Sequence, residues 1–120
     1  MVYLITGKAG AGKSTYAKKL EQELIENGQK VFVLDADTVR MVYENQDYTD
    51  AGREAHLLNI AKIAQLAEIM GFVAIVAAIS PKAEWRDKMR DHWYESRLVY
   101  IPGGTLWAGT TYETPTDEEW

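Results

Sequence analysis

The sequence predicts an α/β fold, with one mostly parallel sheet of about four strands and helices on both of its faces. Strand-like and helix-like patterns alternate along the 120 residues, which is the order that parallel β-α-β units require. The run at residues 72–79 is apolar throughout, as expected for a parallel strand that helices cover on both faces. A chain of this length suffices for one core, so we expect a single domain over residues 1–120.

Four apolar runs are the predicted strands, at Val2–Thr6, Val31–Asp35, residues 72–79 and residues 98–101. Apolar residues at intervals of three and four predict two helices between them. The first has its stripe at Tyr16, Ala17, Leu20, Leu24 and Ile25, and Gly28 ends it. The second covers residues 50–70, with its stripe at Leu57, Ile60, Ala61, Ala64, Ala67 and Met70.

A third helix is predicted to begin at Ser80 and Pro81, because serine is a favoured N-cap and proline fits the first helical position. Its buried face is predicted at Trp85, Met89 and Trp93, which follow one another at intervals of four. The charged residues between them, Arg86 included, fit either a solvent-facing surface or a phosphate contact.

The segment GKAGAGKST, between the first predicted strand and the first helix, has the spacing G-x-x-x-x-G-K-[ST]. Glycines let successive backbone N–H groups face a phosphate, and the following helix adds its positive end. Lys13 supplies a charge for the terminal phosphates, and the Ser14 hydroxyl is a ligand for Mg²⁺. We therefore expect ATP and Mg²⁺ as cofactors, bound by Gly7, Ala9, Gly10, Ala11, Gly12, Lys13, Ser14 and Thr15.

Composition narrows the classes of partner. The net charge of −5 argues against general nucleic-acid binding, which needs clustered Lys and Arg. The sequence has no cysteine, no leader pattern and no apolar run of membrane-spanning length. We expect a cytoplasmic protein with a small nucleotide-like acceptor and no membrane partner; a homodimer is compatible with the sequence.

Ligands of parallel sheets bind at the carboxyl ends of the strands, which brings several polar residues into question. Asp35 and Asp37 follow the second predicted strand, where a carboxylate can hold Mg²⁺ or take a proton from an acceptor hydroxyl; either can instead cap a helix. Because the third predicted strand ends without an aspartate, Asp37 is the expected metal carboxylate beside Ser14. Other candidates with alternative surface or packing roles are Arg40, Tyr48, Arg53, His56 and Trp107.

Five segments together resemble the adenylylsulfate (APS) kinase family: GKAGAGKST, LDADTVR, DYTDAGREAH, IVAAISPKAEWR and WAGTTYETP. The resemblance implies a three-layer P-loop NTPase fold, strand order 2-3-1-4, and a kinase that moves the ATP γ-phosphoryl to the hydroxyl of a nucleotide-like acceptor. It implies catalytic roles for Lys13, Asp37, Arg40 and Arg53. The implied acceptor site comprises Asp35, Asp37, Arg40, Tyr48, Arg53, His56, Ile79, Ser80 and Trp107.

The chain departs from that family in several ways. After ISP it has Lys82-Ala83 where the family has an aromatic residue and an arginine. His56 stands where the family has asparagine, and residues 102–120 replace several dozen family residues that form a basic lid, followed by a C-terminal helix. A lid excludes water and clamps the transferred group. Its shortening leaves two alternatives open besides an APS kinase: a kinase that acts on a nucleic-acid hydroxyl, and a nucleotide-binding module without catalysis.

Overall fold

The structure is a computed structural model that describes residues 1–44, 46–106 and 111–116. It contains one parallel four-stranded sheet in the order β2-β3-β1-β4. The strands are β1 (Val2–Thr6), β2 (Val31–Asp35), β3 (Val73–Ala78) and β4 (Ser96–Tyr100). The helices are α1 (Lys13–Glu26), α2 (Ala36–Val42), α3 (Asp50–Ile69) and α4 (Ala83–Arg90). The α/β class and the strand order are therefore confirmed.

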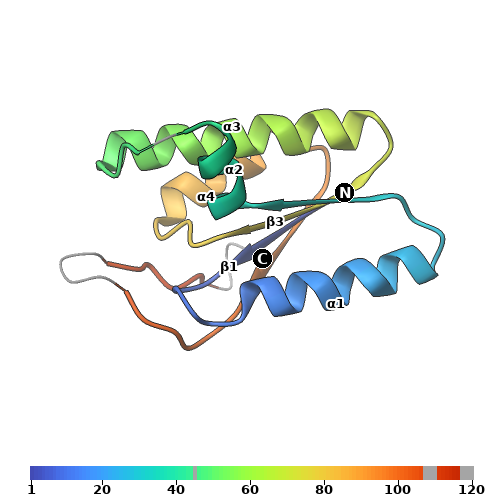
Figure 1. The fold of residues 1–120 in the computed structure, drawn as a ribbon, viewed down its shortest axis with the longest axis horizontal. Helices are drawn as coiled ribbons and strands as arrows, with labels where there is room; N and C mark the ends of the chain where they lie inside the picture. The colour runs from blue at the N-terminus through green and yellow to red at the C-terminus, as the bar shows by residue number, and fades with distance from the viewer. Residues whose placement is uncertain (45, 107–110, 117–120) are drawn as a thin grey trace.

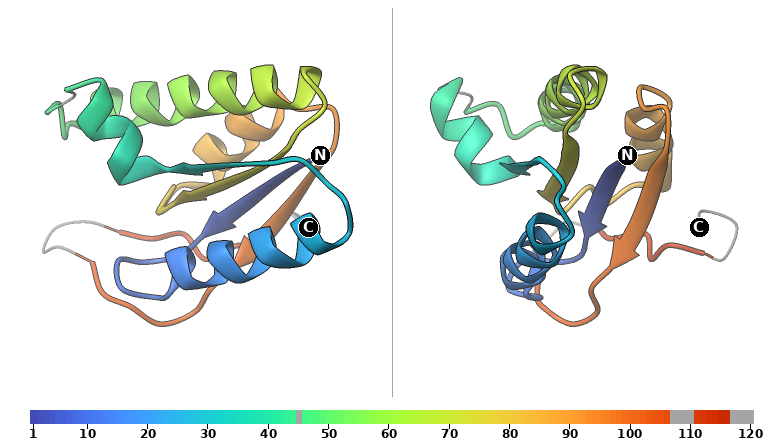
Figure 2. Two further views of the ribbon diagram at one scale, coloured as in Figure 1. Left: turned by 45° about the vertical axis from the view of Figure 1, so that its right-hand side comes forward. Right: turned by 90° about the vertical axis from the view of Figure 1, so that its right-hand side faces the viewer.

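Helices cover the two faces of the sheet unequally. Figures 1 and 2 show α1 below the sheet and α2, α3 and α4 above it. The larger core lies on the α3 and α4 side and includes Leu4, Ile60, Val76 and Met89. On the α1 side, the buried cluster within the described ranges consists of Ile5, Ala17 and Ile75. The central strand β3 is buried along its whole length, which agrees with its uniformly apolar sequence.

The short helix α2 was not predicted, because its seven residues show no clear apolar stripe at helical spacing. Asp35 caps it, since one of its carboxylate oxygens accepts hydrogen bonds from Asp37 N at 2.9 Å and Thr38 N at 3.4 Å. An aspartate at the N-cap satisfies amides that have no partner inside the helix. The cap at this place is thus Asp35, and Asp37 lies in the first turn.

The prediction that Ser80 and Pro81 begin a helix is wrong. Helix α4 begins at Ala83, with Lys82 in the N-cap position. Ser80 has a positive φ of 39°, is 1% exposed, and its hydroxyl donates to Met89 Sδ at 3.6 Å. The Ala83 amide donates instead to Glu113 Oε1 at 3.2 Å, so a carboxylate from the far end of the chain does the work of the cap.

The predicted buried face of this last helix is confirmed in part. Trp85 and Met89 are buried on α4, and Trp93 is buried beyond its end. Trp93 Nε1 donates to Ala61 O at 2.9 Å and so ties this turn to α3. Strand β4 begins two residues earlier than predicted, at Ser96, and ends at Tyr100.

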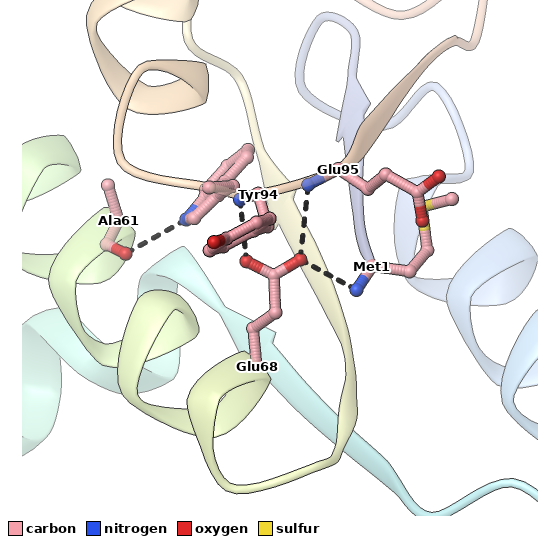
Figure 3. Close-up of polar contacts among 6 residues, drawn as sticks. Met1, Ala61, Glu68, Tyr94 and Glu95 are labelled. Atoms are coloured by element: carbon pink, nitrogen blue, oxygen red, sulfur yellow. Dashed lines mark hydrogen bonds and ion pairs between the residues drawn. The ribbon is translucent and has the colours of Figure 1, made fainter.

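One carboxylate joins α3 to the N-terminus, directly before β1, and to the turn before β4 (Figure 3). Glu68 Oε2 lies 2.6 Å from the Met1 ammonium and accepts from Glu95 N at 3.3 Å. Its other oxygen accepts from Tyr94 N at 2.8 Å. Burial acts to raise the pKa of Glu68, but the bonds from Met1 and the two amides outweigh burial, and the pKa lies below its ordinary value of 4.5.

Beyond β4 the chain crosses back over the carboxyl edge of the sheet (Figure 1). Thr105 N donates to Ala9 O at 2.9 Å, and residues 111–116 lie against β1, α4 and the turn that follows β3 through Tyr112 and Glu113. We call residues 111–116 the return segment. Over the described ranges, no helix combines the length and apolar content needed to cross a bilayer.

Candidate active site

The loop between β1 and α1 has the form of an anion-binding site. Gly12 is the N-cap of α1, with φ 103°, and makes no side-chain cap. The helix's own bonding starts with Tyr16 N donating to Gly12 O at 3.0 Å. The amides of Lys13, Ser14 and Thr15 are therefore left for an external anion, and the helix dipole favours negative charge there.

The glycines of this loop serve two different purposes. Gly10 and Gly12 have φ of +75° and +103°, and a Cβ on either would meet nothing within 4 Å, so their left-handed backbone requires glycine. A Cβ on Gly7 would lie 2.6 Å from Ile101 O. Gly7 thus admits the chain that follows β4, whereas the sequence suggested only that it clears space for phosphate.

Lys13 lies folded onto the loop. Its Nζ donates to Gly7 O at 3.0 Å and to Lys8 O at 2.8 Å. Burial lowers the pKa of the Lys13 ammonium below its ordinary 10.5, while the carboxylates of Asp37 and Asp35 oppose that effect. The charge of Lys13 is therefore held between the loop and two carboxylates, where a terminal phosphate would compete for it.

Two carboxylates follow β2, and their surroundings differ. Ser14 Oγ donates to Asp35 Oδ2 at 3.2 Å, so the carboxylate in contact with the predicted Mg²⁺ hydroxyl is Asp35. Asp37 is exposed and lines the same cleft, close enough to Lys13 to affect its pKa. Hydroxyl and carboxylate oxygens suit Mg²⁺. In the described ranges, no three His, Cys, Asp or Glu residues cluster as a metal cage.

Arginine and tyrosine side chains form the other end of the cleft. The Arg40 guanidinium lies 4.5 Å from the centre of the Tyr48 ring and donates to Asp47 O at 3.3 Å. Arg53 lines the cleft from the first turns of α3. A Cβ on Gly52 would lie 2.2 Å from Asp47 Cγ, so glycine allows the segment bearing Tyr48 to pack closely on α3.

His56 is a buried residue of α3, 3% exposed. Its Nε2 lies 2.9 Å from Ala36 O. Because a carbonyl only accepts, Nε2 carries the hydrogen and neutral His56 presents an unprotonated Nδ1. Burial lowers the pKa of His56 below 6.5; the Ala36 bond and Asp37 oppose this, and Arg40 reinforces it.

These residues line one cleft of about 460 Å³. Of the predicted site residues it includes Ala9, Gly10, Gly12, Lys13, Ser14, Thr15, Asp35, Asp37, Arg40, Tyr48, Arg53, His56, Ile79 and Ser80. Gly7 and Ala11 lie in the same loop between β1 and α1 but do not line the cleft, and Trp107 lies outside the described residues. Thr105 and Leu106 also line it, from the segment after β4 that was expected at this edge of the sheet. Leu57, Ala77 and Ala78 line it too, although their apolar residue types predicted only a buried helix stripe and a buried strand.

Arg86 is not available as a phosphate contact, nor is it part of an outer charged face. It is 0% exposed. Its Nη1 donates to Ser80 O at 2.8 Å and its Nη2 to Glu113 O at 2.6 Å. The neighbouring Asp87 and Lys88 are exposed, so only part of the predicted charged face of this helix exists.

This chain is similar to known proteins in both sequence and fold. The family model described as "Adenylylsulphate kinase" matches residues 1–103. The chain belongs to the adenylylsulphate kinase family. A probable adenylyl-sulfate kinase of Pyrococcus abyssi is 39% identical over 98 residues, which are 81% of this chain and 56% of that protein. An adenylyl-sulfate kinase of Burkholderia ambifaria is 41% identical over 102 residues, 83% of this chain and 56% of that protein.

A solved member of the adenylylsulphate kinase family has a similar fold. The Mycobacterium tuberculosis APS kinase CysC in complex with AMPPNP and APS has a TM-score of 0.79 and 31% sequence identity, and the match covers 84% of this chain and 61% of that one. The chain thus spans about half the length of the curated relatives reported above. The expected membership of this kinase family is confirmed.

Proposed function

We propose that this chain transfers the γ-phosphoryl group of ATP to a hydroxyl of adenylyl sulfate. The observation that carries the proposal is one cleft, in a member of the adenylylsulphate kinase family, that joins two kinds of binding surface. The phosphate loop and the α1 amides line one part of it, Arg40 and Arg53 line another, and Asp37 lies in the same cleft, close enough to Lys13 to affect its pKa. In-line transfer between two bound phosphorylated molecules requires both surfaces in one site.

The residues present fit Mg²⁺ and ATP. The loop amides and Lys13 would hold the phosphates, and Ser14 with Asp35 and Asp37 would hold the ion directly or through water. Mg²⁺, when bound, neutralises charge on the β and γ phosphates. The Asp35 carboxylate is already fixed by capping α2, and we assign it to the metal alone. We assign Asp37 to the acceptor hydroxyl as well as to the metal.

We assign the acceptor to the end of the cleft near α2 and α3. Arg40 and Arg53 would bind its phosphate, because guanidinium groups bind phosphate with two parallel hydrogen bonds. Tyr48 would lie against its base, with one ring face already near Arg40. Ile79, Ser80 and His56 would line the pocket, and Trp107 remains a predicted contact.

We further propose that residues 1–120 act as one domain in which residues 102–120 take the place of a longer lid. Thr105 and Leu106 line the cleft. The hydrogen bond from Thr105 N to Ala9 O fixes the first part of this segment against the phosphate loop. A shorter cover excludes less water, which predicts slower transfer than in an enclosed site and easier entry of large acceptors.

An acceptor screen tests the function. The protein would be incubated with labelled ATP and Mg²⁺ against adenylyl sulfate, nucleosides and DNA oligonucleotides, with its oligomeric state measured in parallel. Label on adenylyl sulfate supports the proposal. Label on DNA would select a nucleic-acid kinase instead, against the net charge of −5. Tight Mg·ATP binding without any transfer would identify a binding module.

Asp37→Asn tests the assignment of the acceptor hydroxyl. We expect the variant to bind Mg·ATP within a few-fold of the parent and to lose about 100- to 10,000-fold in kcat, the usual contribution of general acid–base catalysis. Calorimetry and initial rates measure the two quantities. Asp87→Asn, on the exposed side of α4, is the matched control, and full activity in Asp37→Asn would remove Asp37 from the mechanism.

A further inference from the structure

The cleft wall that follows β3 is a strained turn that must be held from outside. Ile79, Ser80 and Pro81 form this wall. Ser80 has φ 39°, a left-handed conformation that is unfavourable for residues with a side chain. Such a conformation persists where the surrounding contacts determine it. The question is therefore which contacts fix these three residues.

Each of the three successive carbonyl oxygens of the wall accepts a hydrogen bond from a different part of the molecule. Ile79 O accepts from Thr6 Oγ1, at the end of β1, at 2.6 Å. Ser80 O accepts from Arg86 Nη1, on α4, at 2.8 Å. Pro81 O accepts from Glu113 N, in the return segment, at 2.7 Å. The wall is thus fixed residue by residue.

The return segment also holds the other two donors. Thr6 Oγ1 lies 2.8 Å from Tyr112 Oη; since the single hydroxyl hydrogen of Thr6 goes to Ile79 O, the Tyr112 hydroxyl is the donor. Arg86 Nη2 donates to Glu113 O at 2.6 Å. Through Tyr112 and Glu113, residues 111–116 are linked to every bond that fixes the wall.

Burial makes these bonds matter. Thr6 and Arg86 are 0% exposed, and hydrogen bonds in a low-dielectric interior are stronger than in water, as is the cost of leaving one partner unpaired. The Arg86 guanidinium also lies 5.5 Å from the centre of the Tyr112 ring, and that ring stacks on Tyr100 with centroids 6.0 Å apart. The return segment is therefore anchored by both its side chains and its backbone.

The phosphate loop is held separately from this wall. Ala11 N donates to Lys8 O at 3.2 Å, and Thr105 N donates to Ala9 O at 2.9 Å. Lys13 binds two loop carbonyls. Loosening the return segment would therefore alter the wall at Ile79–Pro81 more than the nucleotide-binding loop.

We propose that the return segment is a positioning element, which sets the cleft wall through Tyr112 and Glu113 and so determines affinity for the phosphoryl acceptor. The acceptor meant here is the adenylyl sulfate of the proposed function, on which this inference rests. The family-model match ends at residue 103, although Tyr112 and Glu113 belong to the segment WAGTTYETP, which resembles the family. Neither Tyr112 nor Glu113 is among the cleft-lining residues, so both act through the residues they hold.

Glu113→Ala and Tyr112→Phe test the proposal. In Glu113→Ala we expect the Ala83 amide to exchange about tenfold faster, the value of one lost hydrogen bond. The acceptor KM should rise about three- to tenfold, while the KM for ATP stays within about twofold. Glu113→Gln keeps an oxygen for Ala83 N and should restore most of both values. Tyr112→Phe removes only the hydroxyl and should raise the acceptor KM alone.

Tyr94→Phe, at a residue 97% exposed, is the control and should change neither KM. A lower melting temperature with both KM values unchanged would show that the segment only stabilises the fold, and would overturn the proposal. Equal rises in both KM values would do the same. If the parent protein transfers phosphate to no acceptor, the proposed function fails. Ala83 exchange, measured without ligand, then decides whether the return segment holds the start of α4, directly after the wall. Unchanged exchange in Glu113→Ala overturns the proposal.

Discussion

Asp35 and Asp37, which are separated by one residue, have different surroundings in the fold. The sequence placed both at the carboxyl end of β2 and favoured Asp37 for the metal. In the fold, Asp35 is committed to the α2 cap and to Ser14, whereas Asp37 is exposed in the cleft. Which of the two carboxylates caps a helix, and which is free to contact an ion or an acceptor, depends on where α2 begins. The sequence did not predict the start of α2.

His56 illustrates a residue whose state depends on its burial. Its ring is held by Ala36 O, and burial lowers its pKa. A buried neutral imidazole resists protonation, whereas the same residue in the unfolded chain takes up a proton near its ordinary pKa of 6.5. Protonation therefore favours the unfolded chain.

We predict that the free energy of unfolding is largest above pH 6.5 and decreases as the pH falls toward the lowered pKa of His56. Urea unfolding at closely spaced pH values between pH 5 and 8 measures this. The decrease should be absent in His56→Asn. His92→Asn is the control and should retain it; a wild-type pH profile that His56→Asn leaves unchanged would contradict the prediction.

Helix α3 depends for its placement on contacts at both ends. Its N-terminal part carries Arg53 and His56 into the cleft, and near its C-terminus Glu68 binds Met1, Tyr94 and Glu95 (Figure 3). The carboxylate is 10% exposed, so it has little water to replace a lost partner. Glu68 therefore secures α3 against the sheet, and with it the register of the residues that reach the site.

We predict that Glu68→Gln lowers the free energy of unfolding by about 1.5–3 kcal/mol, the range for hydrogen bonds to a charged group. The control, Glu84→Gln, alters an exposed residue paired with Lys88 at 3.3 Å and should cost less than about 0.5 kcal/mol. Because the folded pKa of Glu68 is lowered, its contribution is complete above pH 4.5 and is lost as the pH falls through the lowered value. An equal effect of both variants at neutral pH would refute the role of Glu68.

The beginning of α4 is an example of local signals that a tertiary contact overrides. Ser80 followed by Pro81 is a favourable helix start by sequence, yet both residues form the cleft wall. Hydrogen bonds from Thr6, Arg86 and Glu113 hold the wall in place. The Glu113 carboxylate also accepts a hydrogen bond from the Ala83 amide. Because of these contacts with residues distant in the sequence, the helix begins two residues later than predicted.

At the scale of the whole molecule, the core is uneven. Among the residues that the structure describes, most of the buried apolar ones lie on the α3 and α4 side of the sheet, and few lie on the α1 side. The edge strand β2 leaves Phe32 and Val33 partly exposed, at 41% and 37%. Stability should therefore be concentrated in the two central strands, β1 and β3, which the rest of the chain covers.

We predict that the amides of β3 and β1 exchange most slowly, near the rate of global unfolding, and that those of β2 and β4 exchange at least about tenfold faster. Native-state hydrogen exchange followed by NMR measures these rates. Protection of β2 equal to that of β3 would mean that the edge strand opens only with the whole domain, contrary to this expectation.

The sequence alone determined the α/β class, the positions of the four strands to within two residues and the phosphate loop, because apolar periodicity and glycine spacing are local properties. It also placed most of the cleft-lining residues, since parallel strands bring their carboxyl ends to one edge. Only the tertiary structure decided which aspartate meets Ser14, that Arg86 is buried, and that residues 111–116 hold the cleft wall. Each of these depends on hydrogen bonds between segments far apart in the chain, and no local pattern encodes such partners.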